Sequence, residues 1–295
     1  MKIKLMKIIL AEHYGLCFGV RDAIAEAEKL ARRAPLTILG ELVHNPVVRE
    51  RLARHGVQER GLGDFAPDGT DTRQVMITAH GASDRKRAEW SAAGFAVADG
   101  TCPLVRHAHR QLGVLVAAGF FPVVIGKAGH VEVEGLVGDF PEGCVIENEG
   151  DISRLPVRER YGVISQTTQP LEKVLELVEA IRRGRPGSEV RFTDTVCQPT
   201  KNRQNALHKL IAECDTLVVV GGRNSNNTLQ LAAAARAAGL RVFHIERPGE
   251  LEPEWFCEAG IVGITAGTST LKETVAAVHA RLEEIAAARH TSIAV

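Results

Sequence analysis

LVVVGGRNSNNTLQLAAAARAAGLRVFHI, residues 217–245, is the stretch that decides the fold class. A valine-rich run leads into a polar loop, then into an alanine-rich helical stretch ending in Ala-Gly, then into a second apolar run. Residues 75–99, VMITAHGASDRKRAEWSAAGFAVAD, repeat this plan. Apolar runs that alternate with helical stretches predict β-α-β units and a parallel sheet.

The same alternation runs along all 295 residues. It predicts strands at 7–11, 37–39, 75–78, 123–125, 162–165, 216–220, 241–245 and 261–265. It predicts helices at 19–33, 45–55, 83–93, 103–118, 171–183, 200–213, 228–238 and 271–288. We therefore expect three similar α/β modules with mostly parallel sheets, at 19–102, 103–193 and 194–295, joined by an N-terminal strand segment at 1–18.

Composition excludes several classes of function. Lys and Arg number 36 and Asp and Glu also number 36, so the basic footprint of a nucleic-acid-binding protein is missing. Aromatic residues make up only 4% of the chain, too few for a platform that stacks bases. Neither an apolar run of about 20 residues nor the apolar core of a signal peptide occurs. We expect a cytoplasmic protein that binds neither nucleic acid nor membrane.

Five of the predicted strands end in a small polar loop that opens a helix. These loops lie at 79–83, 126–132, 166–168, 221–228 and 266–270. The residue types also suit ordinary turns and helix caps, so a single loop of this kind would indicate nothing. Ligands of open α/β sheets bind beyond the carboxyl ends of the strands, and five such loops indicate a shared site there.

Three of the six cysteines stand where a loop enters a helix: Cys17, Cys102 and Cys197. A helix N-terminus lowers the pKa of a thiol and so favours the thiolate, the form that binds metals. The other three, Cys144, Cys214 and Cys257, lie in apolar or helix-end settings and are interpreted as packing residues. Three thiolates without fixed spacing fit an iron–sulfur cluster with one open iron or a Cys₃ zinc site, and spacing does not separate the two.

Histidines and small polar residues in the same loops suggest an anionic ligand. His44, His80 and His130 follow predicted strands, as do Ser225, Asn227 and Ser269 in the loops of the C-terminal module. Such donors suit a phosphate at helix N-termini. Glu132 is a candidate general acid if burial raises its pKa, and otherwise an exposed loop carboxylate.

These motifs, taken in order, resemble the IspH/LytB family of 4-hydroxy-3-methylbut-2-enyl diphosphate reductases. The resemblance spans residues 7–282. It rests on CFGV at 17–20, VHN at 43–45, AHG at 79–81, TCP at 101–103, GHVEVEG at 129–135, QTT at 166–168, Cys197 with NRQ at 202–204, NSNN at 224–227 and TAGTS at 265–269.

The resemblance implies three α/β modules in a pseudo-threefold cloverleaf around a central [4Fe-4S] cluster. It implies cluster ligands Cys17, Cys102 and Cys197, and a diphosphate site of His44, His80, His130, Ser225, Asn226, Asn227 and Ser269. Glu132 and Thr167, with His130 beside them, would deliver the proton that lets the hydroxyl leave as water. Electrons would come from ferredoxin or flavodoxin, and the products would be isopentenyl and dimethylallyl diphosphate.

The chain departs from the family pattern at a few positions. Asn226 replaces a serine, Val131 replaces a proline, and Lys127 stands where a histidine is common. The residues leave two other functions open: a Cys₃ zinc hydrolase of a phosphorylated metabolite with Glu132 as base, and a redox-sensing iron–sulfur protein without turnover.

Overall fold

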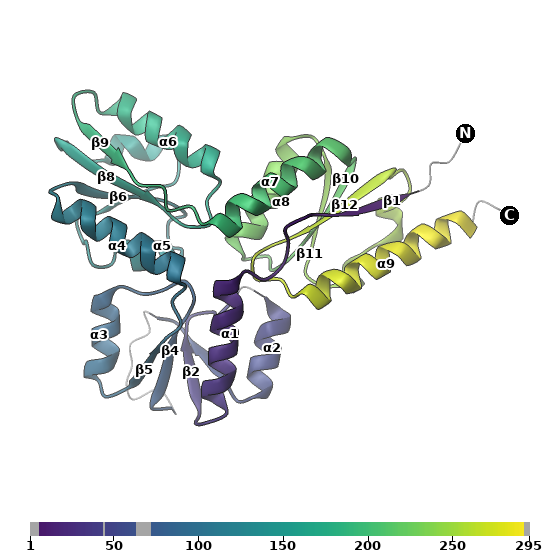
Figure 1. The fold of residues 1–295 in the computed structure, drawn as a ribbon, viewed down its shortest axis with the longest axis horizontal. Helices are drawn as coiled ribbons and strands as arrows, with labels where there is room; N and C mark the ends of the chain where they lie inside the picture. Colours follow the sequence, from purple (N-terminus) through teal and green to yellow (C-terminus); the bar gives the residue numbers. More distant parts are fainter. Residues whose placement is uncertain (1–5, 44, 63–71, 292–295) are drawn as a thin grey trace. The chain divides into compact units, whose positions relative to one another are not determined.

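The structure is a computed structural model that describes residues 6–43, 45–62 and 72–291. These residues form three four-stranded sheets. Within each sheet, all paired strands are parallel. The prediction of three α/β modules with parallel sheets is confirmed (Figure 1).

The three sheets contain the following elements. The first sheet has β2 (Leu36–Leu39), β3 (Gln58–Arg60), β4 (Gln74–Ile77) and β5 (Ala96–Asp99), with α1 (Phe18–Ala31), α2 (Pro46–Arg54) and α3 (Asp84–Ala92). The second has β6 (Phe121–Ile125), β7 (Cys144–Ile146), β8 (Arg160–Ser165) and β9 (Glu189–Phe192), with α4 (Pro103–Ala117), α5 (Val131–Val137), η2 (Glu149–Arg154) and α6 (Leu171–Gly184). The third has β10 (Thr216–Val220), β11 (Arg241–Ile245), β12 (Ile261–Ala266) and the N-terminal β1 (Lys7–Leu10), with α7 (Gln198–Glu213), α8 (Asn226–Ala237), η3 (Pro248–Glu250), η4 (Pro253–Phe256) and α9 (Lys272–Thr291).

One strand order is used three times. The orders are β3-β2-β4-β5, β7-β6-β8-β9 and, read from its other edge, β11-β10-β12-β1. In the first two sheets the chain leaves the first central strand toward one edge and the second central strand toward the other edge. In the third sheet it runs from β10 to β11 at one edge, and the N-terminal β1 fills the other edge, because α9 rather than a strand follows β12. The point where the direction reverses is the place where such sheets bind ligands. The loops after β2, β4, β6, β8, β10 and β12 flank these three points.

The chain divides into two compact units. The terminal unit falls within Met1–Cys17, His44–Val47 and Gln198–Val295 and holds the third sheet. The middle unit falls within Phe18–Val43 and Val48–Cys197 and holds the first and second sheets. The module boundaries at 19–102, 103–193 and 194–295 stay a prediction.

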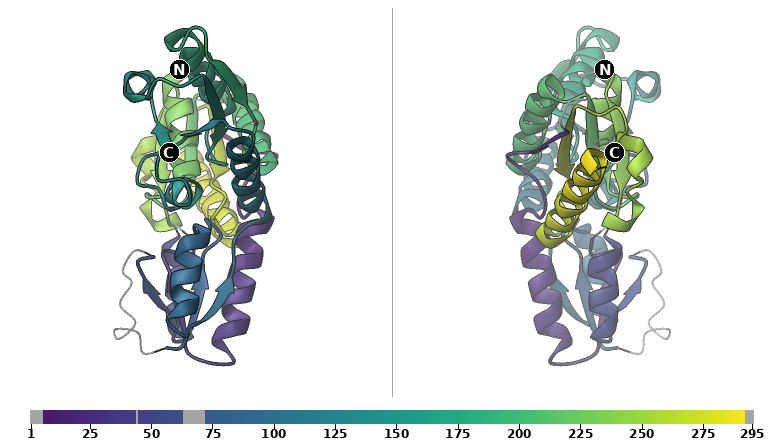
Figure 2. Two further views of the ribbon diagram at one scale, coloured as in Figure 1. Left: turned by 90° about the vertical axis from the view of Figure 1, so that its left-hand side faces the viewer. Right: turned by 90° about the vertical axis from the view of Figure 1, so that its right-hand side faces the viewer.

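The third sheet is covered on both faces. Val218 and Val220 of β10 pack with α9, whose apolar residues Val275, Val278, Leu282 and Ile285 are buried. Leu217 and Val219, the alternate residues of β10, pack with α7 and α8. Figures 1 and 2 show these helices on the two sides of the strands. Double coverage explains why β10 is an unbroken apolar run.

Three strands were not predicted, and β5 and one α-helix were anticipated only indirectly, β5 as the second apolar run of the repeat at 75–99 and the helix by the loop at 126–132 that opens it. The strands β3, β7 and β9 all lie at sheet edges and have few fully buried residues, so no apolar run marks them. The helix is α5, where a histidine loop was expected; its seven residues are too few to reveal a helical period. Within the described ranges, no helix is long and apolar enough to span a membrane.

The two repeated stretches share their local plan but occupy different places in their sheets. Residues 75–99 become β4, α3 and β5, which are a central strand, its helix and the edge strand that follows. Residues 217–245 become β10, α8 and β11, which run to the opposite edge of their sheet. The local pattern therefore predicts a β-α-β unit without fixing its position.

Candidate functional site

The three singled-out cysteines occupy equivalent positions. Cys17 directly precedes α1, Cys102 is the N-cap of α4, and Cys197 directly precedes α7. Each follows an edge strand that completes a sheet: β1, β5 and β9, respectively. The predicted loop-to-helix junctions are confirmed at all three cysteines.

Each of these cysteines makes the same kind of hydrogen bond, from its backbone N–H to a backbone carbonyl group. The Cys17 N–H donates to the Thr268 carbonyl at 3.1 Å. The Cys102 N–H donates to Ala79 and the Cys197 N–H to Thr167, both at 3.0 Å. Each acceptor is the second residue after β12, β4 or β8. The backbone thus ties every one of these cysteines to the loop after the second central strand of its own sheet.

The expectation that the other three cysteines are packing residues holds for Cys144 and Cys214 but is wrong for Cys257, which is exposed. Burial raises the pKa of the Cys214 thiol to about 11 and also raises that of Cys144, so both thiols stay protonated at neutral pH. At Cys102 the neighbouring chain instead leaves room for the sulfur: a Cβ added to Gly19 would lie 2.4 Å from Cys102 Sγ. Among the described residues, no group of three His, Cys, Asp or Glu side chains is arranged to hold a single metal ion.

Glu132 is a buried acid. It lies in the first turn of α5, and only 1% of its surface is exposed. Its Oε1 accepts a hydrogen bond of 2.6 Å from the Thr167 N–H. Burial raises the pKa of Glu132 to about 7, against the lowering effect of the hydrogen bonds from Thr167. The alternative of an exposed loop carboxylate is wrong.

Thr167 links this acid to a cysteine. Its N–H donates to Glu132, and its carbonyl accepts from the Cys197 N–H. Glu132 and Cys197 are 65 positions apart in sequence, yet a single residue joins them in space. The acid and the cysteine therefore belong to one local structure in the middle unit.

His130 and His80 lie beside each other near this acid. His130 caps α5, where its Nδ1 accepts from the Glu132 N–H at 3.1 Å. That bond requires an unprotonated Nδ1, which places the proton of the neutral ring on Nε2. The two imidazole rings are 5.4 Å apart and nearly perpendicular. The loops after β4 and β6 thus bring two of the predicted diphosphate ligands together.

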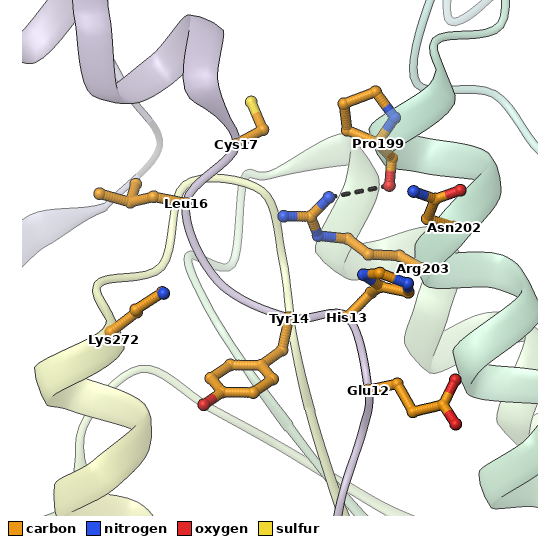
Figure 3. A pocket seen from close by; sticks show the side chains of 9 residues that line it. All are labelled: Glu12, His13, Tyr14, Leu16, Cys17, Pro199, Asn202, Arg203 and Lys272. Carbon is orange, nitrogen blue, oxygen red and sulfur yellow. Dashed lines mark hydrogen bonds between the residues drawn. The ribbon is translucent and has the colours of Figure 1, made fainter.

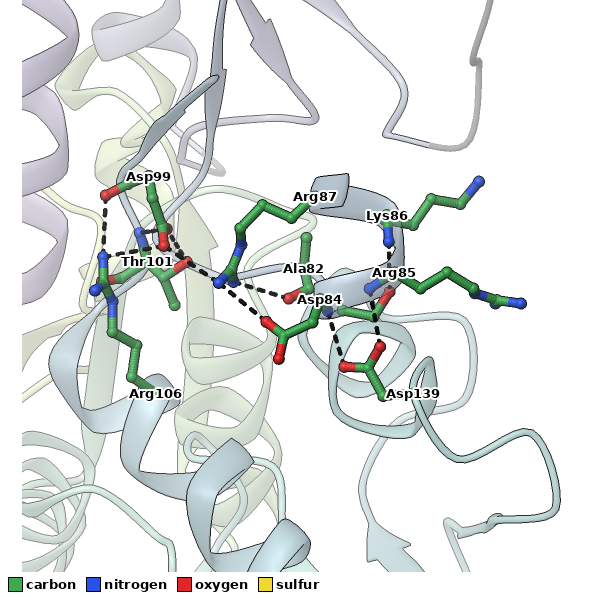
Figure 4. A network of polar contacts seen from close by, with 10 residues as sticks. Ala82, Asp84, Arg85, Lys86, Arg87, Asp99, Thr101, Arg106 and Asp139 are labelled. Carbon is green, nitrogen blue, oxygen red and sulfur yellow. Dashed lines mark hydrogen bonds and ion pairs between the residues drawn. The ribbon is translucent and has the colours of Figure 1, made fainter. Parts of the chain in front are cut away.

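Close packing fixes these two loops against each other. A Cβ on Gly135 of α5 would lie 3.4 Å from Ala82, and one on Gly138 would lie 2.7 Å from the Ser83 Cβ. Asp139 then accepts from the first backbone N–H groups of α3, at Asp84 (2.8 Å) and Arg85 (3.0 Å), as Figure 4 shows. A carboxylate at a helix N-terminus is stabilising, so Asp139 joins the second sheet to the first.

The loops of the third sheet carry neutral donors. Ser225 caps α8 through its Oγ, which accepts from the Thr228 N–H at 3.4 Å. Asn227 Oδ1 accepts from the Thr268 N–H at 3.1 Å and so joins the loops after β10 and β12. The Ser269 Oγ is buried and has no hydrogen-bond partner within the part of the chain that the structure describes. Asn226 begins α8 and is 5% exposed.

One predicted residue lies outside the described ranges, and two residues of the site were not singled out. His44 falls outside the described residues. Its neighbour Asn45 donates from Nδ2 to the Ser269 carbonyl at 2.7 Å. Gln166 is fully buried, and its Oε1 accepts from the Lys127 N–H at 3.1 Å. Both stand in quoted motifs, but an amide side chain by itself indicates no chemistry.

The departures from the family pattern fit the local structure. Val131 is the first residue of α5, a position whose N–H has no partner within the helix, so proline and valine are both tolerated there. Lys127 is exposed and contributes its backbone N–H to Gln166.

A cavity of about 450 Å³ opens beside Cys17 in the terminal unit (Figure 3). Its lining comprises Glu12, His13, Tyr14, Leu16, Cys17, Pro199, Asn202, Arg203 and Lys272. Figure 3 shows Arg203 reaching from α7 and Lys272 from α9 toward the segment that ends at Cys17.

Each parallel α/β module opens with a helix, and a cysteine stands directly before or at the start of that helix. This arrangement defines a class of α/β proteins with three equivalent cysteines. A sequence model of the LytB protein family matches residues 8–283, and the chain belongs to this family. The chain is 36% identical over 289 residues to 4-hydroxy-3-methylbut-2-enyl diphosphate reductase of Geobacter metallireducens, covering 96% of this chain and 99% of the relative. It is 35% identical over 290 residues to the enzyme of that name from Aquifex aeolicus, covering 95% and 97%.

Solved structures agree with this assignment. The E-1-hydroxy-2-methyl-but-2-enyl-4-diphosphate reductase of Plasmodium falciparum superposes with a TM-score of 0.84 at 26% identity, over 92% of this chain and 86% of that one. A second structure is described as (E)-4-hydroxy-3-methyl-but-2-enyl diphosphate reductase, the terminal enzyme of the non-mevalonate pathway. It gives a TM-score of 0.66 at 35% identity, over 95% and 99%.

Proposed function

We propose that this protein is a 4-hydroxy-3-methylbut-2-enyl diphosphate reductase. The reaction adds two electrons and two protons to the (E)-substrate, breaks the bond between C4 and its hydroxyl oxygen, and releases water. One proton leaves with the oxygen. The other adds to carbon at either end of the allylic system, which gives isopentenyl or dimethylallyl diphosphate. Family membership supports the reaction, and the Glu132–Thr167–Cys197 connection is the observation in the structure that carries it.

Cys17, Cys102 and Cys197 would hold a [4Fe-4S] cluster. Their equivalent places, each directly before or at the start of a helix and each tied by its backbone N–H to the loop after a central strand, support this assignment. When bound, such a cluster supplies a Lewis-acidic iron and a store for single electrons, which no side chain supplies.

The proton that leaves with the oxygen would come from Glu132. A pKa of about 7 keeps a large share of this acid protonated at neutral pH, as a general acid requires. Its Oε1 accepts from the Thr167 N–H, so the acidic proton is held on Oε2. His130 would assist as a neutral ring with its proton on Nε2.

The diphosphate would bind to His44, His80, His130, Ser225, Asn226, Asn227 and Ser269. The Ser269 hydroxyl, buried and without a partner among the described residues, supports a ligand in that place. Hydroxyl and amide groups at the start of α8 can donate to phosphate oxygens together with the backbone N–H groups there. Holding the diphosphate would orient the small carbon skeleton for the reaction.

Ferredoxin or flavodoxin would deliver the electrons one at a time. Balanced overall charge argues against nucleic acid as a partner. We also propose a cytoplasmic location without a membrane partner, where thiolates stay reduced.

One experiment separates this function from a zinc hydrolase and from a redox sensor. The protein is purified without oxygen and analysed for iron, sulfide and zinc, then assayed with reduced methyl viologen and the C5 diphosphate. We expect four iron and four sulfide per chain and release of both products. Zinc without iron would support the hydrolase. A cluster without turnover would support the sensor.

A further inference from the structure

Arg203 is a buried arginine next to the proposed cluster site, without a role in the reaction described above. Only 5% of its surface is exposed. Its Nη1 donates to the Pro199 carbonyl at 2.8 Å, and its Nη2 donates to the Gly15 carbonyl. One guanidinium thus joins two segments that are 184 positions apart in sequence.

Both segments adjoin cysteines. Gly15 is two residues before Cys17, and Pro199 is two residues after Cys197, in the first turn of α7. The turn at Gly15 has a φ of +73°, which favours glycine, and an added Cβ would lie 3.1 Å from the Thr270 carbonyl. The segment that ends at Cys17 is therefore held at two points. Arg203 donates to the Gly15 carbonyl, and the Cys17 N–H donates to the Thr268 carbonyl.

The contact needs an arginine. Its planar fork presents two donors in fixed directions, which a single ammonium group on a flexible stem does not reproduce. Both acceptors are main-chain carbonyl groups. Arg203 and Cys17 line the same cavity (Figure 3), where a positive charge would stabilise an anionic cluster.

A second cysteine segment is held in a similar way. Arg106 donates from Nε to the Thr101 carbonyl at 3.3 Å and from Nη2 to the Asp99 carbonyl at 3.2 Å, as Figure 4 shows. These carbonyl groups lie one and three residues before Cys102. An arginine bonded to main-chain carbonyl groups is thus found beside two of the three proposed cluster ligands.

We infer that Arg203 is a positioning residue for Cys17: it holds the loop before this cysteine against α7 in the conformation that receives the cluster. This inference rests on the proposed cluster, which gives the contact its purpose. The two hydrogen bonds of Arg203 themselves form in the protein without a cluster.

The test measures the alkylation rate of each cysteine in the cluster-free full-length chain, with iodoacetamide and peptide mass analysis. In Arg203→Lys, which keeps the positive charge, we expect Cys17 to react roughly tenfold faster, the factor for losing one hydrogen bond from a charged donor. Arg203→Met should also accelerate Cys17, by a smaller factor because it removes the positive charge as well. Cys102 and Cys257 should keep their rates. Arg106→Lys should accelerate Cys102 and leave Cys17 unchanged.

Arg185→Lys is the matched control. Arg185 also bonds main-chain carbonyl groups, those of Ile152 and Leu155, in contacts that include none of the three cysteines. It should change neither Cys17 nor Cys102. If the Arg203 variants unfold, Gly15→Ala disturbs the same carbonyl with Arg203 intact and should accelerate Cys17 alone.

The loaded protein gives an independent readout. Loss of iron to a chelator should be several-fold faster in both Arg203 variants, and the reduction potential should fall in Arg203→Met but stay in Arg203→Lys, which keeps the charge. Unchanged Cys17 alkylation in both variants, or equal acceleration of all cysteines, would overturn the inference. If the wild-type chain binds no iron but Cys17 is still alkylated faster in the Arg203 variants, the proposed cluster is wrong and the positioning role of Arg203 stands.

Discussion

The β6/β8 loop pair (residues 126–132 and 166–168) and the β10/β12 loop pair (residues 221–228 and 267–270) occupy the same place in two sheets of the same strand order. The β6/β8 loop pair buries an acid whose pKa is raised to about 7. The β10/β12 loop pair buries hydroxyl and amide groups that do not titrate near neutral pH. One repeated frame thus surrounds a titratable acid in one module and neutral polar groups in another.

The hydrogen bonds explain how the same frame supports both. In each pair a backbone group of the second loop holds a side chain from the first: the Thr167 N–H holds Glu132, and the Thr268 N–H holds Asn227. The carbonyl group of that same residue, Thr167 or Thr268, accepts from a cysteine N–H. The backbone arrangement is common to both pairs, and the side chain that it holds differs: a carboxyl group in one pair and an amide in the other.

The largest expected effect concerns the three proposed cluster ligands, of which the two loop pairs hold Cys197 and Cys17. Cys17→Ser, Cys102→Ser and Cys197→Ser should each lose the cluster or nearly all activity, because serine is a poor ligand for iron–sulfur clusters. Cys144→Ser, Cys214→Ser and Cys257→Ser are the controls and should keep iron and sulfide. Cluster loss in Cys144→Ser with retention in Cys102→Ser would refute the assignment.

The next effect tests the acid of the β6/β8 loop pair. Glu132→Gln should retain iron and substrate binding yet lower kcat by about 10²–10⁴, since an amide cannot deliver the proton that leaves with the oxygen. Steady-state kinetics with reduced viologen measure this. A near-normal kcat would reduce Glu132 to a structural residue.

Stability provides a third test, independent of turnover. The pKa of Glu132 rises from an ordinary value of 4.5 to about 7 on folding, so the folded state favours its neutral form. The associated stability is complete below pH 4.5 and is lost as the pH rises through about 7. The free energy of unfolding of Glu132→Gln, relative to that of wild type, should therefore increase by up to about 3 kcal/mol as the pH rises from 4.5 to 8.

Urea unfolding of the cluster-free protein at pH 5 and pH 8 would measure this difference. Asn227→Ala is a suitable control, because its change in stability should be the same at both pH values. A difference between Glu132→Gln and wild type that does not vary with pH would contradict the raised pKa.

A smaller effect is expected in the β10/β12 loop pair. Asn227→Ala removes the buried bond to the Thr268 N–H, which leaves that donor unpaired and costs about 1–3 kcal/mol. The KM for the diphosphate should rise roughly tenfold or more, with a smaller fall in kcat. The pH dependence of kcat should stay that of wild type. A change in that dependence would contradict the division of labour between the two loop pairs.

The smallest effect is expected at the residue that departs from the family. Asn226→Ser should leave kcat within a few-fold and change mainly KM, because serine and asparagine both donate to phosphate oxygens at the start of α8. If wild type fails to reduce the C5 diphosphate while Asn226→Ser gains this activity, the substrate assignment is wrong.

The sequence by itself determined the central strands, the helices between them, the polar loops that follow, and the three cysteines at helix starts. Each of these is a local pattern: an apolar run covered on both faces, or a residue type that a turn or a helix start requires. The edge strands β3, β7 and β9 and the short helix α5 lacked such a pattern, since half-exposed strands and two turns of helix carry no clear period.

Only the tertiary structure decided the surroundings of Glu132 and Arg203. A carboxyl group acquires a pKa near 7 because distant residues bury it, and its partner Thr167 lies 35 positions along the chain. Arg203 meets Gly15 across 188 positions. Desolvation and long-range hydrogen bonds depend on how the elements pack, and a local sequence pattern carries no record of that packing.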